Sequence, residues 1–284
     1  MSGFTADWLA LREPYDARAR NRDVLGAVAA AAASAGSIAV VDLACGTGAT
    51  LRAIAPRLPA RQEWRLVDND LSLLARAAAG ASARGVTVTR IPVDLTRDLE
   101  AALDGPIDFV TASALLDLVS AEWLDRLVLE VAARRLPLYA ALTYDGRVAF
   151  DPADPLDRSV IAAVNRHQQT DKGFGPALGP GAAAAAIAGF EAADYVVVHG
   201  RSDWRLSPRD QEIQRDMLAG WAGAAREIGA VSLAEAAGWV TRRRDLVAAG
   251  RSTITVGHVD LFARPIGTRA ADRSQSNSTS SPSG

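Results

Sequence analysis

Cysteine, lysine and histidine are scarce in this chain of 284 residues. It has one cysteine, Cys45, and three histidines, and Lys172 is the one lysine among 31 basic residues. A single cysteine cannot form a disulfide bond within the chain. No His, Cys or Asp cluster has the spacing of metal ligands, so we predict no metal site.

An excess of basic charge is also missing. The formal net charge is -2 and the sequence pI is about 6.0, which argues against general nucleic-acid binding. The first twenty residues carry charges and no long apolar run, so we expect neither a signal peptide nor a membrane span. We therefore expect a cytoplasmic protein, either a monomer or a homodimer.

Short apolar runs alternate with helical segments along the first half of the chain. This alternation is typical of an α/β protein with a mostly parallel sheet and helices on both faces. The predicted strands are 38–43, 64–67, 86–91, 107–112, 138–143, 195–198 and 252–262. The predicted helices are 47–58, 71–83, 97–103, 121–135, 158–168, 182–190, 208–228 and 233–249, with one or two more within 5–33.

The pattern changes after the fifth predicted strand. Residues 144–180 are rich in Asp, Pro and Gly, and two long helices precede the last strand. The final stretch is polar and of low complexity, so we predict that it is disordered. The predicted organisation is a helical cap at 1–35, a main domain at 36–266 with insertions at about 144–180 and 205–250, and a tail at 267–284.

A glycine-rich turn follows the first strand, in the sequence VVDLACGTG. Glycines let a ligand approach the backbone closely, and ligands of such sheets bind at the carboxyl ends of the strands. Leu51 stands where the dinucleotide fingerprint G-x-G-x-x-G/A has Gly or Ala, which disfavours a nicotinamide enzyme. Asp42 would repel a pyrophosphate but suits a sulfonium ligand that carries an ammonium group.

These segments resemble the class I S-adenosylmethionine (SAM)-dependent methyltransferases. The glycine turn resembles their first motif, and DFVTASALLDLVS resembles their fourth. The resemblance implies a Rossmann-like, seven-stranded sheet with an antiparallel last strand, and N-terminal helices that cover the cofactor. It also implies SAM as cofactor and S-adenosylhomocysteine (SAH) as product.

The resemblance assigns cofactor-binding roles to residues at the strand ends. Asp68 is placed at the ribose hydroxyls, and Asp94 and Leu95 at the adenine. An arginine of the N-terminal helices could bind the methionine carboxylate; we select Arg18, with Arg12 and Arg20 as alternatives. The complete predicted cofactor set is Arg18, Asp42, Ala44, Gly46, Gly48, Asp68, Asn69, Asp94, Leu95 and Ser113.

The acceptor site is predicted from position and polarity. Tyr144 and Asp145 directly follow the fifth strand, at the edge where ligands bind. The polar loop 167–175 contains the sole lysine, which suggests an anionic acceptor, although a solvated loop is the alternative. We predict His167, Tyr144 and Asp145 as catalytic residues, and Asp117, Lys172 and Phe174 as acceptor-binding residues. Asp117 could equally mark a helix start.

The predicted function is methyl transfer to a small-molecule acceptor by in-line displacement. The amino-methyltransferase signature N-P-P-Y/F is absent, because this place reads Ala112-Ser113-Ala114-Leu115. Three alternatives stay open: an RNA or protein methyltransferase, a non-catalytic SAM- or SAH-binding module, and an NAD-dependent oxidoreductase, which the glycine turn disfavours.

Overall fold

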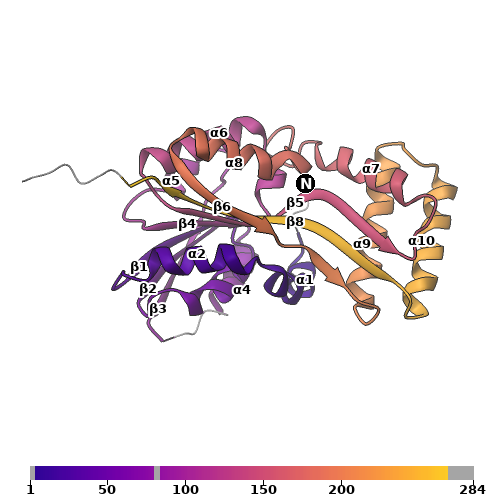
Figure 1. The fold of residues 1–284 in the computed structure, drawn as a ribbon, viewed down its shortest axis with the longest axis horizontal. Coiled ribbons are helices and arrows are strands. Elements are labelled where there is room, and N and C mark those ends of the chain that lie inside the picture. Colours follow the sequence, from indigo (N-terminus) through magenta and orange to yellow (C-terminus); the bar gives the residue numbers. More distant parts are fainter. Residues whose placement is uncertain (1–3, 80–83, 268–284) are drawn as a thin grey trace, which may run out of the picture.

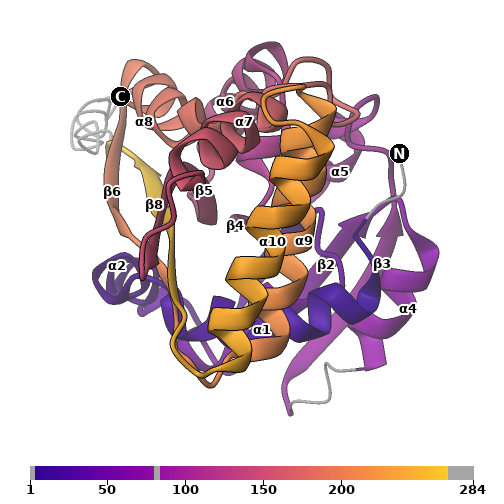
Figure 2. The same ribbon diagram turned by 90° about the vertical axis from the view of Figure 1, so that its right-hand side faces the viewer.

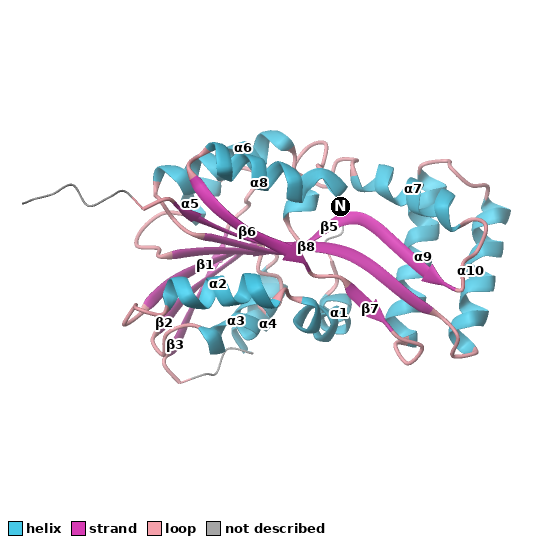
Figure 3. Ribbon diagram, in the orientation of Figure 1, coloured by secondary structure: helices cyan, strands magenta, loops and turns pink. Residues whose placement is uncertain are grey.

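A mixed sheet of eight strands runs through the molecule (Figures 1 and 3). The computed structural model describes residues 4–79 and 84–267. The strand order is β3-β2-β1-β4-β5-β8-β6, and β7 pairs with β8. The first five strands are parallel, and β8 runs antiparallel to its neighbours β5, β6 and β7. The strands are β1 (Ile38–Leu43), β2 (Gln62–Asp68), β3 (Val86–Pro92), β4 (Phe109–Ser113), β5 (Leu138–Asp151), β6 (Tyr195–Arg201), β7 (Trp204–Leu206) and β8 (Thr253–Pro265).

Helices cover both faces of this sheet, which confirms the predicted α/β class. In Figure 3, α2, α3 and α4 lie below the sheet, and α5, α6 and α8 lie above it. Each layer packs on its own buried cluster of apolar side chains. The helices are α1 (Ala6–Ala19), α2 (Arg22–Ala32), α3 (Ala49–Ile54), α4 (Leu71–Ala79), α5 (Leu99–Ala102), α6 (Ala121–Ala133), α7 (Asp157–Gln168), α8 (Ala182–Ala192), α9 (Gln211–Glu227) and α10 (Leu233–Ala248).

The sheet departs from the prediction on its antiparallel side. β5 does not end near Thr143 but continues to Asp151, and it pairs with the similarly long β8. The prediction ended the strand early because Asp145 and Gly146 have the composition of a loop. These two residues lie where the register of β5 and β8 shifts, between Tyr144 and Val148, so the strand resumes beyond them. The short β7 brings the count to eight strands rather than seven.

The long pair β5–β8 carries a helical cap. Because β5 is parallel to β4, its extension projects past the carboxyl ends of the parallel strands. Helices α7, α9 and α10 pack on this extension around a third buried apolar cluster, which includes Trp239 and Tyr144 (Figure 2). Trp8, Leu11 and Tyr15 of α1 pack against the same cluster. The carboxyl edge therefore lies between the cap and the N-terminal helix.

The N-terminal helices separate into α1 and α2 at Arg20 and Asn21, which precede α2 in an extended conformation. The Asn21 side chain caps α2 by accepting hydrogen bonds from the N–H groups of Asp23 and Val24. The predicted helix at 71–83 is described as far as Ala79. Residues 268–284 of the predicted tail lie outside the described residues, and the division into cap, main domain and tail stays a prediction.

Candidate cofactor and acceptor site

The glycine turn after β1 has a backbone that requires small residues. Gly46 and Gly48 have φ angles of 53° and 80°, in the left-handed region. Ala44, with a φ of 51°, shares this conformation. A Cβ atom on Gly46 would lie 3.2 Å from Cδ1 of Leu9, a residue of α1. Helix α1 therefore lies directly over the turn, as the predicted N-terminal lid should.

Asp68 ends β2, and Asp94 follows the adjacent parallel strand β3. The Asp68 carboxylate accepts hydrogen bonds from the N–H of Gly46, at 2.8 Å, and the N–H of Asp70, at 3.0 Å. Because Asp68 pairs with Pro92 in the β2–β3 register, Asp94 lies two residues past the same edge. Each carboxylate accepts two hydrogen bonds within the chain and can accept further ones, since a carboxylate has about four acceptor positions. The free acceptor positions of Asp68 fit the two hydroxyls of a ribose, and those of Asp94 fit an amino group.

The other predicted cofactor residues at this edge differ in exposure. Asn69 is exposed beside Asp68, whereas Leu95 is buried. The Leu95 carbonyl accepts a hydrogen bond from the indole N–H of Trp123, at 2.7 Å. This bond joins the turn after β3 to α6, so the structure fixes the position of the backbone at Leu95.

Asp42 is a fully buried carboxyl group at the end of β1. Its Oδ1 accepts a hydrogen bond of 2.7 Å from the Thr111 hydroxyl, while Oδ2 has no partner among the described residues. Burial raises the pKa of Asp42 to about 7. A buried acceptor without a partner favours a donor from a ligand, and the ammonium of a methionine group is such a donor.

Arg20, rather than Arg18, reaches the strand ends. The Arg20 guanidinium is buried and donates to the Tyr139 hydroxyl, at 3.1 Å, and to the Ser113 hydroxyl, at 3.4 Å. Its Nε has no partner among the described residues. Arg18 is exposed on α1, with its guanidinium 4.6 Å from the centre of the Tyr15 ring.

A second set of buried polar groups lies where β5 leaves the sheet. Tyr144 pairs with His258 of β8 in the strand register, and their ring centroids are 6.2 Å apart. The Asp117 carboxylate accepts a hydrogen bond of 3.4 Å from the N–H of Tyr144. The His258 ring also lies 5.2 Å from that of Trp204, and the Arg12 guanidinium is 5.0 Å from the Trp204 ring.

Burial shifts the acid–base properties of two members of this set. It raises the pKa of Asp117 to about 6, and the nearby charge of Arg12 opposes this rise. Burial lowers the pKa of His258 to about 3, and Arg12 lowers it further. The imidazole is therefore neutral near pH 7, and its Nδ1 has no hydrogen-bond partner in the described part of the chain. Asp117 can accept a proton at this pH.

The structure does not gather all predicted acceptor residues in one place. His167 Nε2 lies 2.9 Å from a Glu227 carboxylate oxygen, and Lys172 Nζ lies 3.2 Å from His167 Nδ1. These contacts link α7 to the end of α9, in the cap. Burial lowers the pKa of Lys172. The carboxylate of Asp145 binds Arg147 at 2.7 Å, so it belongs to a local ion pair.

Phe174 and Tyr144 occupy other surroundings. The Phe174 ring meets Trp123 edge-on, with centroids 5.3 Å apart. Tyr144 donates its hydroxyl proton to Asn165, at 2.7 Å. Of the predicted acceptor residues, the structure thus joins Tyr144 with Asp117. The sequence does not indicate that His258 and Trp204 lie at the carboxyl edge of the sheet. Only the pairing of β8 with β5 and β7 brings them there.

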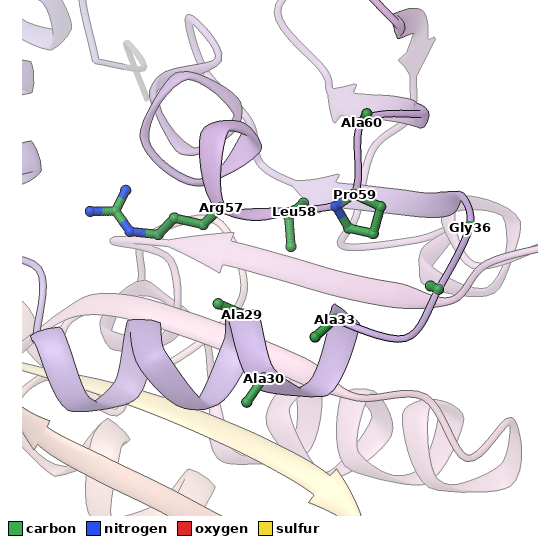
Figure 4. A pocket seen from close by; sticks show the side chains of 9 residues that line it. Ala29, Ala30, Ala33, Gly36, Arg57, Leu58, Pro59 and Ala60 are labelled. Carbon is green, nitrogen blue, oxygen red and sulfur yellow. The ribbon is translucent and has the colours of Figure 1, made fainter.

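A hollow of about 550 Å³ lies at the opposite edge of the sheet (Figure 4). It lies between the end of α2 and the segment before β2, and alanines form much of its lining. Arg57 is the one titratable residue in its lining. Because the strands begin there, the hollow is remote from Asp42 and Asp68 and belongs to neither part of the candidate site.

Comparison with known proteins bears on the family and the fold. Residues 40–136 match the methyltransferase domain family. A cyclopropane-fatty-acyl-phospholipid synthase-like protein from Lactobacillus casei is 14% identical, with a TM-score of 0.51 over 92% of this chain and 95% of that one. This likeness shows the fold.

Two further solved structures are similar. The cyclopropane synthase MmaA2 from Mycobacterium tuberculosis has a TM-score of 0.49 and 10% identity, over 92% of this chain and 95% of that one. A SAM-dependent methyltransferase from Thiobacillus denitrificans, in complex with SAH, has a TM-score of 0.43 and 17% identity, over 93% of this chain and 100% of that one. No curated protein matches the sequence.

Within residues 4–79 and 84–267, no helix has the length and apolar character to cross a membrane. The cytoplasmic location stays a prediction.

Proposed function

This chain carries a class I S-adenosylmethionine-dependent methyltransferase domain, and we propose that it methylates a small-molecule acceptor held beneath helix α1. The proposal depends above all on one observation. Asp117, Tyr144 and His258 lie together at the carboxyl edge, beyond Asp42 and Ser113, and the cap and α1 cover them. An acceptor bound there would lie next to the methionine end of the cofactor.

The cofactor would bind across the ends of the first four parallel strands. Asp68 and Asn69 would hold the ribose, and Asp94 and Leu95 the adenine. Asp42, Ala44, Gly46 and Gly48 would surround the methionine part, together with Ser113. We assign the methionine carboxylate to Arg20 instead of Arg18, because Arg20 has an unpartnered buried Nε and reaches Ser113. SAM supplies a methyl group that is already electrophilic on its sulfonium.

The protein then needs to orient the acceptor, exclude water and remove a proton where the acceptor carries one. Asp117 is suited to the last task, because a carboxylate whose pKa is about 6 is ionised at neutral pH and still basic. We place this role on Asp117 rather than on His167, which lies against Glu227. The neutral imidazole of His258 would accept or donate a hydrogen bond to the acceptor.

The closed position of α1 supports a small acceptor. Leu9 lies over the glycine turn, and Trp8, Leu11 and Tyr15 pack against the cluster of the cap. A large RNA or protein surface would have to displace this helix, whereas a small molecule can be enclosed by it. The charge of Arg12 acts on both Asp117 and His258, but its Nε and Nη2 already bind Asp16, at 2.9 and 3.2 Å, so Nη1 is the nitrogen left for an anionic acceptor.

Transfer of an isotope-labelled methyl group tests this proposal. The protein is incubated with methyl-labelled SAM and, separately, with small-molecule, RNA and protein fractions of the source organism. We expect label in a small molecule, and a loss of at least about a hundredfold in rate for Asp117→Asn. His167→Ala serves as the matched variant and should retain the rate. Label only in the RNA or protein fraction, or a normal rate with Asp117→Asn, would refute the proposal.

A further inference from the structure

A hollow of about 350 Å³ separates α1 from the corner between β6 and β7. Tyr15, Arg18 and Ala19 line it from α1, and four residues between 201 and 205 line it from the corner. We name it the arginine hollow, because Arg18, Arg201 and Arg205 converge on it from three different elements. Trp204, which lines the hollow, also packs against His258. The hollow therefore lies directly outside the proposed acceptor region around Asp117, Tyr144 and His258.

The three arginines have unused donors. Among the described residues, none of the three guanidinium groups forms an ion pair, although the charge of Arg18 acts on Tyr15 and Asp210 and that of Arg201 acts on Asp203. All three side chains belong to exposed residues. Arg18 contacts only the face of the Tyr15 ring, at 4.6 Å, which leaves the edges of its guanidinium available to a ligand.

The nearby carboxylates are engaged elsewhere. Asp203 binds Arg147 at 2.8 Å and also accepts the N–H of His258, at 3.3 Å. Asp210 accepts the hydroxyl protons of Tyr15, at 3.0 Å, and of Ser207, at 2.7 Å. Asp203 lines the hollow, and the charges of Arg201 and Arg18 help to lower the pKa values of Asp203 and Asp210, but neither carboxylate forms an ion pair with the arginines of the hollow. Three positive charges thus face one lining carboxylate, which leaves an excess of positive charge for an anion.

We propose that the arginine hollow binds the phosphate group of a small-molecule ligand, and that this ligand joins α1 to the β6–β7 corner. One guanidinium satisfies a carboxylate with two parallel N–H bonds, whereas phosphate has enough oxygens for several guanidiniums at once. The ligand would hold the lid in its closed position by adding contacts across the hollow. This site needs neither SAM nor the methyl acceptor, so it is independent of the proposed function.

Calorimetry on the full chain without SAM tests the site. We expect inorganic phosphate and phenyl phosphate to bind at low salt, acetate to bind at least about tenfold more weakly, and the phosphate affinity to fall as salt is added. The double variant Arg201→Gln/Arg205→Gln should lose at least about tenfold in phosphate affinity. Arg244→Gln, an exposed arginine of α10, is the matched control and should bind normally.

Two further measurements address the lid and the source of the phosphate. Phosphate should slow hydrogen exchange of the α1 amides in the wild type and not in the double variant. Sedimentation with phosphatidic acid vesicles shows whether a lipid headgroup can also supply the phosphate. If the double variant no longer sediments with the vesicles, the same arginines bind the lipid phosphate. Absent phosphate binding, equal affinity of the double variant with an unchanged melting temperature, or unaltered exchange in α1 would overturn the proposal.

Discussion

Arg52 of α3 binds the Glu13 carboxylate of α1 through two parallel contacts, Nε–Oε1 at 2.6 Å and Nη2–Oε2 at 2.7 Å. The remaining nitrogen of the guanidinium donates to the Thr47 carbonyl in the glycine turn, at 2.6 Å. One side chain thus connects the lid to the backbone that should meet the cofactor. Because the pair is about 30% exposed, its contribution to stability is about 1 kcal/mol or less.

Glu13→Gln should therefore change cofactor release more than folding. We expect SAM to dissociate about five- to tenfold faster, because α1 opens more readily, while the melting temperature changes little. Stopped-flow fluorescence measures the dissociation rate. Asp7→Asn is the control, since Asp7 is almost fully exposed and lies 3.8 Å from Arg76. Equal dissociation rates for Glu13→Gln and the wild type would show that this ion pair does not hold the lid.

The raised pKa of Asp42 predicts how SAM affinity depends on pH. Asp42 titrates at about 7 in the free protein, and only its ionised form attracts the ammonium group of the methionine. Affinity should therefore increase between about pH 6 and 8, by up to about tenfold. Calorimetry at several pH values measures this slope. Asp42→Asn should remove the slope; a variant whose affinity still increases with pH would exclude Asp42 as its source.

The raised pKa of Asp117 predicts how the free energy of unfolding depends on pH. Its pKa is raised to about 6 in the folded chain, against an ordinary value of 3.8, so folding favours the protonated form. Through Asp117, the wild type should lose stability as the pH rises from about 4 to above 6, by up to about 3 kcal/mol. Asp117→Asn cannot ionise at this position, so it should lose up to about 3 kcal/mol less than the wild type over this range, while Asp42, whose pKa is also raised, contributes the same loss in both proteins. Urea unfolding at a series of pH values compares the two proteins; parallel curves would contradict the shifted pKa.

Much of the cofactor region could be predicted because its signals are local. Asp42 is close in the chain to Gly46 and Gly48. Asp68 and Asp94 stand at or just after the ends of short strands. Parallel strands present their carboxyl ends at one edge, so the sequence order alone places these residues together. The choice between Arg18 and Arg20 could not be made in this way. It depends on where α1 ends: Arg18 is inside the helix, whereas Arg20 follows it with an extended backbone.

The proposed acceptor region depends on contacts between distant segments. His258 and Tyr144 are far apart in the sequence, and their proximity follows from the β5–β8 register and its two shifts. No periodic pattern reveals such shifts, because Asp145 and Gly146 have turn composition. The composition of the polar loop suggested a role for His167 and Lys172 in acceptor binding. The structure places His167 against Glu227 of α9 and Lys172 beside His167.

The most direct test of the account is calorimetric titration of SAM into the wild type, Asp68→Ala and Asp70→Ala. Asp68 should accept hydrogen bonds from the ribose hydroxyls, and each charge-assisted bond lost should cost about 1.5–3 kcal/mol. Asp70 caps α4 through the N–H groups of Ser72 and Leu73, so its variant controls for local disruption. The account predicts SAM binding by the wild type, a loss of more than about tenfold in Asp68→Ala, and nearly normal affinity in Asp70→Ala. A wild type that does not bind SAM, or an Asp68→Ala variant that binds it equally well, would contradict the account.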